Sequence, residues 1–174
     1  GIEAFNCESL QEIYVINEMA HVHGLKANVS VRINPDIDAH THKYVTTGLY
    51  ENKFGISQHE FDKLIDILKK SEHINFIGLH FHIGSQITRV GEVFALECQR
   101  VNDIVAYFER NGLKVNNINL GGGLGVDYDD PDEGAIPDFE TWFRTISENI
   151  TRRDDQAVHV EPGRSLVAQC ATLI

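Results

Sequence analysis

The 174-residue sequence predicts an α/β fold in which parallel strands alternate with helices. Short apolar, strand-like segments begin near residues 29, 74, 116 and 156, and a helical pattern of apolar residues fills each gap between them. Residues 2–6, IEAFN, add a strand-like segment ahead of the first helical pattern. Strands separated by helices in this way are typical of βα units, whose strands pair in parallel.

The first elements carry local signals for their ends. Ser9 and Glu12 form a capping-box pattern, after which apolar residues recur at helical spacing. Residues 28–34, NVSVRIN, are short and rich in β-branched side chains, which favours a strand. Ser57 and Glu60 repeat the capping-box pattern ahead of a second amphipathic helix. The later elements are expected in this order: strand 74–81, a helix closed by Gly112, strand 116–120, a helix over 139–150, and strand 156–161.

Repeats of this length suit either a doubly wound sheet or a (β/α)8 barrel. Nothing in the sequence marks a switch point, and five strands cannot close an eight-stranded barrel. We therefore predict that residues 1–174 form a partial barrel domain, about the second half of a TIM barrel. Both ends of the chain are apolar, so we expect its open sheet edges to be covered by segments outside these residues.

The composition restricts the class of partner. A formal net charge of −11 disfavours nucleic acid and anionic membranes, but it leaves room for a small anionic ligand in a locally positive pocket. The three cysteines, Cys7, Cys98 and Cys170, have no metal-binding spacing and indicate a reducing, cytoplasmic setting. The sequence contains neither a signal peptide nor an apolar run of transmembrane length.

Polar residues and glycines follow the predicted strands, at the edge of the sheet where βα proteins place their sites. The Gly121–Gly123 run offers backbone N–H groups that an anion can approach without meeting a Cβ atom. Gly163 and Arg164 add an N–H group and a guanidinium, and Ser85 adds a hydroxyl. Together these donors predict a phosphate site, although a glycine-rich turn without a ligand is the alternative for the first of them.

Three further side chains at this edge admit more than one interpretation. Glu161 can act as a base, a metal ligand or a partner for a ring nitrogen, or it can form an internal ion pair with Arg32 or Arg164. His80 and His82 lie two residues apart and so face the same side of their strand. They are either hydrogen-bonded barrel residues, a zinc pair, or an aromatic platform for a flat cofactor.

Taken in order, these stretches of sequence resemble the alanine-racemase-like decarboxylases that use pyridoxal phosphate (PLP), and among them the diaminopimelate decarboxylases. The stretches are FNCES, RINPDIDAHTHKYVTTG, NKFGIS, GLHFHIGSQI, NLGGGLGVDY and EPGRSLVA. The glutamine in Gly84-Ser85-Gln86 favours the diaminopimelate branch. The resemblance implies a PLP-binding TIM barrel that decarboxylates meso-2,6-diaminopimelate to L-lysine and CO2, the last step of lysine biosynthesis.

The resemblance also implies roles for the matching residues. His82 is expected against one face of the pyridoxal ring, Glu161 at the pyridine nitrogen, and Arg32 near the ring and His82. Lys53 and the Thr46–Gly48 loop are expected at the interface of a homodimer, and no metal is expected. The cofactor phosphate is expected on the following residues, the last of which would also touch the substrate: Ser85, Gly121, Gly122, Gly123, Gly163 and Arg164.

Members of this family hold the cofactor covalently through a lysine. The stretch Lys26-Ala27-Asn28 looks like the family's anchoring sequence, but Lys26 precedes its strand and is expected at the opposite end of the sheet from Glu161. A six-residue strand spans about 20 Å, beyond the reach of a lysine side chain. We therefore expect the anchoring lysine on an early barrel strand, and a cysteine and a tyrosine of the site on a β-rich second domain, all outside these residues. The chain alone is expected to be inactive.

Three other functions stay open at this point. One is a PLP-dependent decarboxylase of the same superfamily that acts on another polar or basic amino acid. Another is a non-catalytic PLP-binding barrel, which would also need an anchoring lysine. The third is a zinc-dependent barrel hydrolase that uses His80 and His82, but glycines, Glu161 and Arg164 occupy the later strand ends where its other ligands would be needed.

Overall fold

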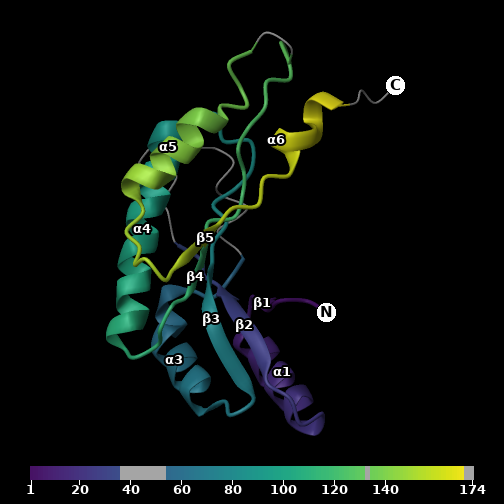
Figure 1. Cartoon of the computed structure of the whole chain (residues 1–174), viewed down its shortest axis with the longest axis vertical. Helices are drawn as coiled ribbons and strands as arrows, with labels where there is room; N and C mark the ends of the chain where they lie inside the picture. The colour runs from purple at the N-terminus through teal and green to yellow at the C-terminus, as the bar shows by residue number, and fades with distance from the viewer. Residues whose placement is uncertain (36–53, 132–133, 171–174) are drawn as a thin grey trace.

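A computed structural model describes residues 1–35, 54–131 and 134–170. Within these residues, five strands form one parallel sheet in the order β1-β2-β3-β4-β5, so β1 and β5 are its edges (Figure 1). Strand order therefore follows sequence order without the reversal of a doubly wound sheet, which confirms the barrel-like arrangement. The strands are β1 (Phe5–Cys7), β2 (Ala27–Arg32), β3 (Ile74–His80), β4 (Asn117–Asn119) and β5 (Ala157–His159).

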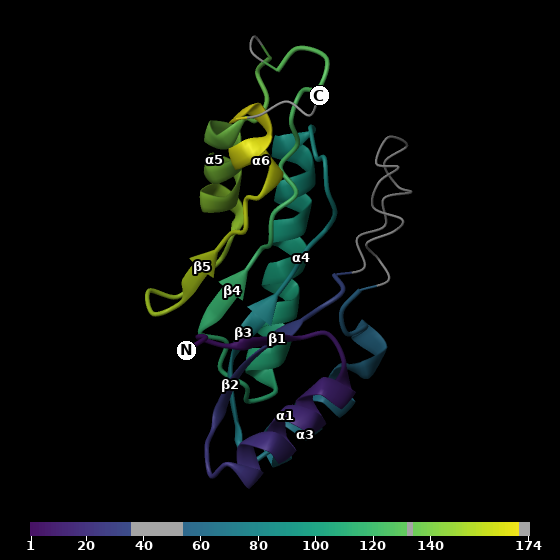
Figure 2. The ribbon, with the colours of Figure 1, turned by 90° about the vertical axis from the view of Figure 1, so that its right-hand side faces the viewer.

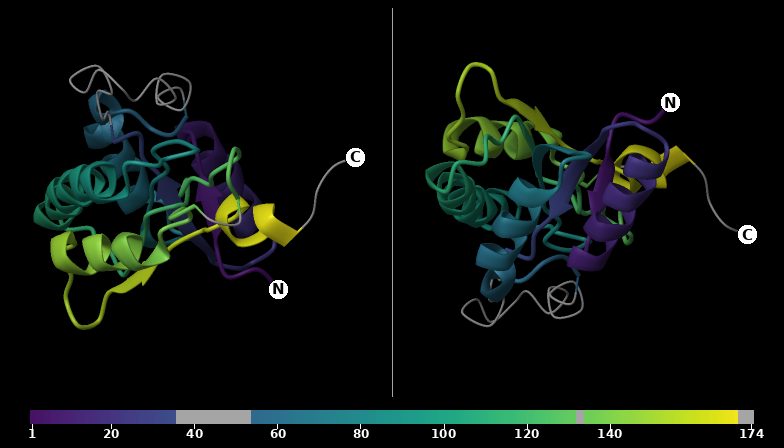
Figure 3. Two further views of the ribbon diagram at one scale, coloured as in Figure 1. Left: turned by 90° about the horizontal axis from the view of Figure 1, so that it is seen from above. Right: turned by 90° about the horizontal axis from the view of Figure 1, so that it is seen from below.

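The long helices follow one another around one side of the sheet, as the two end-on views in Figure 3 show. In Figure 2 the strands lie in front of α4, the longest of these helices. The long helices are α1 (Leu10–Val22), α3 (Phe61–Lys70), α4 (Val90–Arg110) and α5 (Phe139–Asn149). Three short turns of helix complete the described elements: η1 (Gln58–Glu60), α6 (Arg164–Val167) and η2 (Ala168–Cys170). No described helix is long and apolar enough to cross a membrane.

The hydrophobic core lies between the sheet and this helical layer. Val29 and Val31 of β2 and Leu79 of β3 are fully buried, and they belong to the same cluster as Phe94 and Phe108 of α4. Burial of large apolar side chains from both layers is the main force that holds the helices on the sheet. The core therefore fixes the position of each strand end, where the candidate site lies.

Both predicted helices are present, but only the first of the two predicted capping boxes is confirmed. The Ser9 hydroxyl accepts a hydrogen bond from the N–H of Glu12 at 3.2 Å, and the Glu12 carboxylate accepts one from the N–H of Ser9. Ser57 instead starts the short helix η1, where its hydroxyl accepts from the N–H of His59 at 3.3 Å. Glu60 precedes α3 without a side-chain cap, because the 3₁₀ turn separates it from Ser57.

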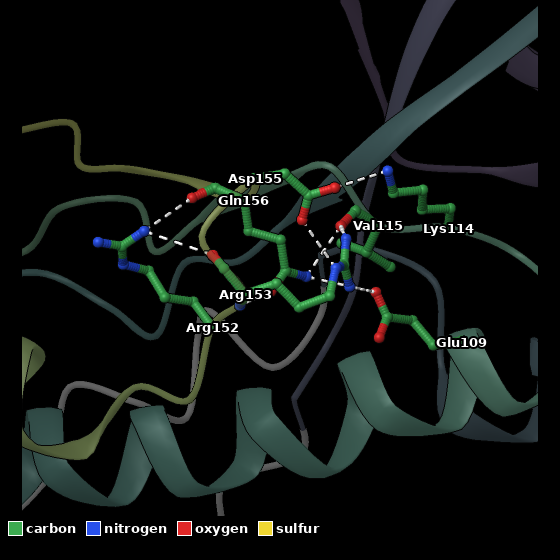
Figure 4. A network of polar contacts seen from close by, with 7 residues as sticks. All are labelled: Glu109, Lys114, Val115, Arg152, Arg153, Asp155 and Gln156. Atoms are coloured by element: carbon green, nitrogen blue, oxygen red, sulfur yellow. Dashed lines mark hydrogen bonds and ion pairs between the residues drawn. The ribbon is translucent and has the colours of Figure 1, made fainter.

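A polar network ties the elements together at the amino-terminal end of the sheet (Figure 4). Gln156, just before β5, donates from Nε2 to the carbonyl of Val115 at 2.8 Å and accepts from the N–H of Arg153 at 2.7 Å. Arg153 also donates to the Val115 carbonyl and forms an ion pair with Glu109 near the end of α4. These bonds hold the start of β5 against α4 and the lead-in to β4, far along the strands from the candidate site.

Candidate functional site

The carboxyl-terminal ends of β3, β4 and β5 bring together the side chains that the sequence singled out. His80 ends β3, Asn119 ends β4, and Glu161 follows β5 by two residues. Backbone bonds continue past the strands, since the N–H of Glu161 donates to the carbonyl of Gly121 at 2.6 Å. Three loops distant in sequence therefore meet at one edge of the sheet, as expected for a site in a βα fold.

Glu161 is held by two side-chain donors at this edge. His80 Nε2 lies 3.2 Å from Oε2 of Glu161, and Asn119 Nδ2 donates to Oε1 at 2.9 Å. Within the described residues the partner of Glu161 in an internal pair is therefore His80, and not Arg32 or Arg164, the two partners considered from the sequence. Burial raises the pKa of the Glu161 carboxyl, but the hydrogen bonds from His80 and Asn119 outweigh this effect and hold the pKa below its usual value. The carboxyl thus stays ionised at neutral pH.

The two histidines contribute differently. The His80 side chain is buried, and its Nδ1 has no hydrogen-bond partner within the described residues. His82 follows β3, and its Nδ1 accepts from the N–H of Gly122 at 3.3 Å. A lone pair at Nδ1 puts the proton of a neutral His82 ring on Nε2. The described ranges contain no group of three or more histidine, cysteine, aspartate or glutamate side chains that could hold a metal, so nothing in them favours the zinc-pair interpretation.

The three glycines allow neighbouring loops to approach one another closely. A Cβ atom on Gly121 would lie 2.4 Å from the carbonyl oxygen of Phe81, and one on Gly122 would lie 2.2 Å from that of Glu161. A Cβ atom on Gly123 would lie 2.2 Å from the carbonyl oxygen of Gly84. Any side chain here would push the loops after β3, β4 and β5 apart, so the glycines are required by the packing of the site itself.

Two of the three N–H groups that the sequence offered to a phosphate have partners inside the protein. The N–H of Gly121 donates to Oδ1 of Asn119 at 2.8 Å, and that of Gly122 donates to His82. The N–H of Gly123 donates to no residue in the described ranges. Asn119 thus connects the glycine run to the Glu161 carboxylate, a role that its place at the end of a short strand did not reveal.

Open space and exposed donors lie beside this cluster. A Cβ atom on Gly163 would meet nothing within 4 Å, which leaves room for a ligand in front of its backbone. Arg164 is exposed, and its Nη1 donates to Oε1 of Gln86 at 3.0 Å. Ser85 is partly buried in the loop after β3, next to Gln86. The donors predicted for an anion are therefore gathered at the same edge as Glu161.

Arg32 and Lys26 occupy opposite ends of β2. Arg32 Nη1 donates to Oε1 of Glu8 at 2.5 Å, and its guanidinium lies over the ring of Phe54 at 5.2 Å from the centroid. Arg32 ends β2 in register with His80 of β3, which places it beside the candidate site. Lys26 is exposed and precedes the first residue of β2, as predicted, so the length of that strand separates it from the site. Lys53 and the Thr46–Gly48 loop lie outside the described residues.

The sequence of the chain is similar to that of one family of known proteins along almost its whole length. The sequence matches the pyridoxal-dependent decarboxylases, in their pyridoxal binding domain, over residues 1–168. The diaminopimelate decarboxylase of Bacteroides thetaiotaomicron is 49% identical over the whole chain, and that of Pseudomonas aeruginosa is 40% identical. The chain spans 45% and 41% of the lengths of these two relatives.

Solved structures give the same result. A diaminopimelate decarboxylase from Helicobacter pylori in complex with L-lysine matches with a TM-score of 0.79 and 37% identity. The match covers 96% of this chain and 41% of that protein. The enzyme from Methanocaldococcus jannaschii, also in complex with L-lysine, matches with a TM-score of 0.78 over 96% of this chain and 39% of that protein. The fold and its sequence motifs therefore agree along nearly all of the chain.

Proposed function

The chain belongs to the pyridoxal-dependent decarboxylases, through their pyridoxal-binding domain, and from that premise we propose that it is part of a diaminopimelate decarboxylase. The reaction is the loss of CO2 from meso-2,6-diaminopimelate to give L-lysine, with PLP as the cofactor. The relatives from Bacteroides thetaiotaomicron and Pseudomonas aeruginosa carry this activity in their names, and the chain spans less than half of their length. The proposal therefore concerns the full-length protein that contains these residues.

The observation that carries the proposal is the ionised carboxylate of Glu161 at the strand ends. His80 and Asn119 hold it in place, and its side chain is 50% exposed, so one side of it is open to a ligand. When bound, PLP supplies a pyridine ring that withdraws electrons from the substrate most strongly when its nitrogen is protonated. A carboxylate with a low pKa keeps such a nitrogen protonated, which is the chemistry we assign to Glu161.

The remaining donors fit the phosphate and ring of the cofactor. Arg164, Ser85 and the open face of Gly163 would bind the phosphate, together with the N–H of Gly123. Arg164 would also reach the substrate carboxylate. Gly121 and Gly122 would act by bringing the loops together, and His82 would lie against one face of the ring with Arg32 nearby. Arg164 thus gives this edge of the sheet a positively charged donor for an anion in a protein whose overall charge is −11.

We propose that the lysine that binds the cofactor covalently is supplied by another part of the full-length protein, as are the other barrel strands and a β-rich second domain. The place of Lys26 before β2, at the other end of that strand from Glu161, supports this assignment. We further propose a cytoplasmic homodimer. The cytoplasmic assignment rests on Cys7, Cys98 and Cys170, which are all free thiols. Light scattering of the full-length protein tests the dimer, and a monomeric mass would contradict it.

The function is tested by incubating the full-length protein with PLP and meso-diaminopimelate and measuring CO2 and L-lysine. Release of both supports the proposal, whereas PLP binding without CO2 release contradicts it. L-Ornithine and L-arginine serve as competing substrates, since faster turnover of either would favour another decarboxylase of the superfamily. In the same assay, Glu161→Gln should lower kcat at least about a hundredfold while PLP still binds, because an amide cannot keep the ring nitrogen protonated. Unchanged turnover would remove Glu161 from the mechanism.

A further inference from the structure

We infer that Gln86 is a positioning residue that fixes the Arg164 guanidinium at the site, an inference that rests on the proposed function. Gln86 lies in the loop after β3, and Arg164 is the first residue of α6, the short helix that follows β5. Arg164 Nη1 donates to Oε1 of Gln86 at 3.0 Å. The two residues are 78 positions apart in the sequence, so only the fold brings them together.

The orientation of the Gln86 amide is fixed by the backbone of a third loop. Its Nε2 donates to the carbonyl oxygen of Val126, and its Oε1 accepts from the N–H of Val126 at 3.3 Å. A carbonyl can only accept and an N–H can only donate, so the amide cannot be flipped without losing both bonds. The oxygen of Gln86 is therefore always the atom presented to Arg164.

The backbone at Gln86 has an unusual conformation that supports this assignment. Its φ is +59°, the only positive φ among the described residues other than glycine. L-residues with a side chain adopt this region at a cost, which glycine avoids. A strained glutamine therefore occupies a place that suits glycine, and the three bonds of its amide offset the strain. Such outliers concentrate at functional sites.

Arg164 depends on Gln86 for its orientation. Its guanidinium has one further described contact, with the ring of Tyr128, whose centroid is 6.0 Å away. Nη1 is thus fixed by Gln86 and one face is turned to Tyr128, while Nε and Nη2 donate to no described residue. Those two nitrogens form the fork that binds a carboxylate or a phosphate in a bidentate manner. Without Gln86, an exposed arginine would lose its single hydrogen bond and sample other rotamers.

The inference is tested by a double-mutant cycle in the full-length protein with PLP, using Gln86→Met, Arg164→Ala and their combination. Methionine keeps the length of the side chain but removes all three amide bonds. Gln86→Met should raise KM for meso-diaminopimelate roughly tenfold with little change in kcat, the loss expected for one hydrogen bond to a charged group. In the Arg164→Ala background the same substitution should leave KM unchanged within about twofold, because Gln86 then has no guanidinium to position.

Two variants separate positioning from loop stability. Gln86→Gly adopts the positive φ without strain, so it keeps the backbone of the turn and should raise KM as Gln86→Met does. The matched control is Gln156→Met, because Gln156 also uses both ends of its amide, and it bonds the Val115 carbonyl at the far end of the sheet. Gln156→Met should lower the melting temperature and leave KM unchanged.

The outcomes are distinct. An equal factor in KM for Gln86→Met in both backgrounds would overturn the inference, since Gln86 would then act without Arg164. PLP affinity, measured by equilibrium dialysis, identifies the anion: a coupled loss of PLP affinity indicates the cofactor phosphate, and a loss in KM alone indicates the substrate carboxylate. If the wild-type protein released no CO2, the proposed function would fail. A coupled loss of PLP affinity in the same cycle would then still support the role of Gln86, and the absence of a coupled loss would overturn it.

Discussion

Glu97 gives the sharpest test of the energetics of this structure. It lies on α4, its side chain is completely buried, and neither carboxyl oxygen has a hydrogen-bond partner among the described residues. Desolvation raises the pKa of Glu97 well above its ordinary value of 4.5, so the folded protein holds this carboxyl in the neutral form. The unfolded chain instead releases the proton above about pH 4.5.

The sign of the effect follows from proton linkage. Above pH 4.5 the unfolded state binds fewer protons than the folded state, so the free energy of unfolding falls as the pH rises. The loss is about 1.4 kcal/mol for each pH unit, and it stops when the pH reaches the pKa of Glu97 in the folded protein. Glu97→Gln removes the titration, so its gain in stability over the wild type should grow with pH at up to this slope. Glu97→Met also removes the titration, and it should be about 1–3 kcal/mol more stable than Glu97→Gln at every pH, because it leaves no buried polar atoms without partners.

The assay is urea unfolding of the chain at pH 6, 7 and 8, followed by the fluorescence of Trp142. Trp142 is the single tryptophan of the sequence, is fully buried on α5, and packs on Phe94 of α4 at 5.5 Å between ring centroids. It therefore reports on the packing of α5 against α4, the helix that contains Glu97. Glu148→Gln, an exposed change on α5, is the control and should give a difference that does not vary with pH. A flat difference for Glu97→Gln as well would refute the reasoning.

Three further substitutions test the candidate site in the full-length protein with PLP. Gly122→Ala puts a methyl group 2.2 Å from the carbonyl oxygen of Glu161, so we expect loss of PLP binding in equilibrium dialysis. Wild-type affinity for PLP would show that the loops after β4 and β5 can move apart without loss of the site. Asn119→Ala removes a hydrogen bond that lowers the pKa of Glu161, so the acidic limb of the pH profile of kcat should move to higher pH; an unmoved limb would assign that limb to another group. Lys26→Met should leave covalent cofactor attachment intact, which borohydride reduction and peptide mapping can check, and loss of the labelled peptide would make Lys26 the anchor.

The order and type of the strands could be predicted because they depend on local pattern. Runs such as NVSVRIN favour a buried strand, and all five predicted strands appear in the structure with the predicted parallel pairing. The capping box at Ser57 was predicted wrongly, because Ser57 caps a 3₁₀ turn that precedes α3, and Glu60 makes no side-chain cap bond. The capping-box pattern alone does not distinguish an α-helix from a 3₁₀ turn.

The contacts within the candidate site depend on tertiary structure and were only partly visible in the sequence. Glu161 was noticed, but its partners His80 and Asn119 were not assigned to it, because they come from two other strands. Gln86 was noticed only as a mark of one branch of the family. Glu97 was missed altogether, since an acidic residue on a helix usually faces solvent. Sequence spacing does not reveal a buried carboxyl such as that of Glu97. It also does not reveal a positive φ at a residue that is not glycine, such as Gln86.

The structure gives the Gly121–Gly123 run a role in packing the loops of the site, in addition to the anion binding that the sequence predicts. A sequence GGG after a strand is read most easily as a cradle of free N–H groups, yet Gly121 and Gly122 use their N–H groups on Asn119 and His82. A side chain at any of the three glycines would clash with a neighbouring loop, because the backbones of these loops lie against the glycine backbone. It follows that the glycine run fixes the positions of Glu161 and His82 relative to one another, because it sets how closely the loops after β3, β4 and β5 approach.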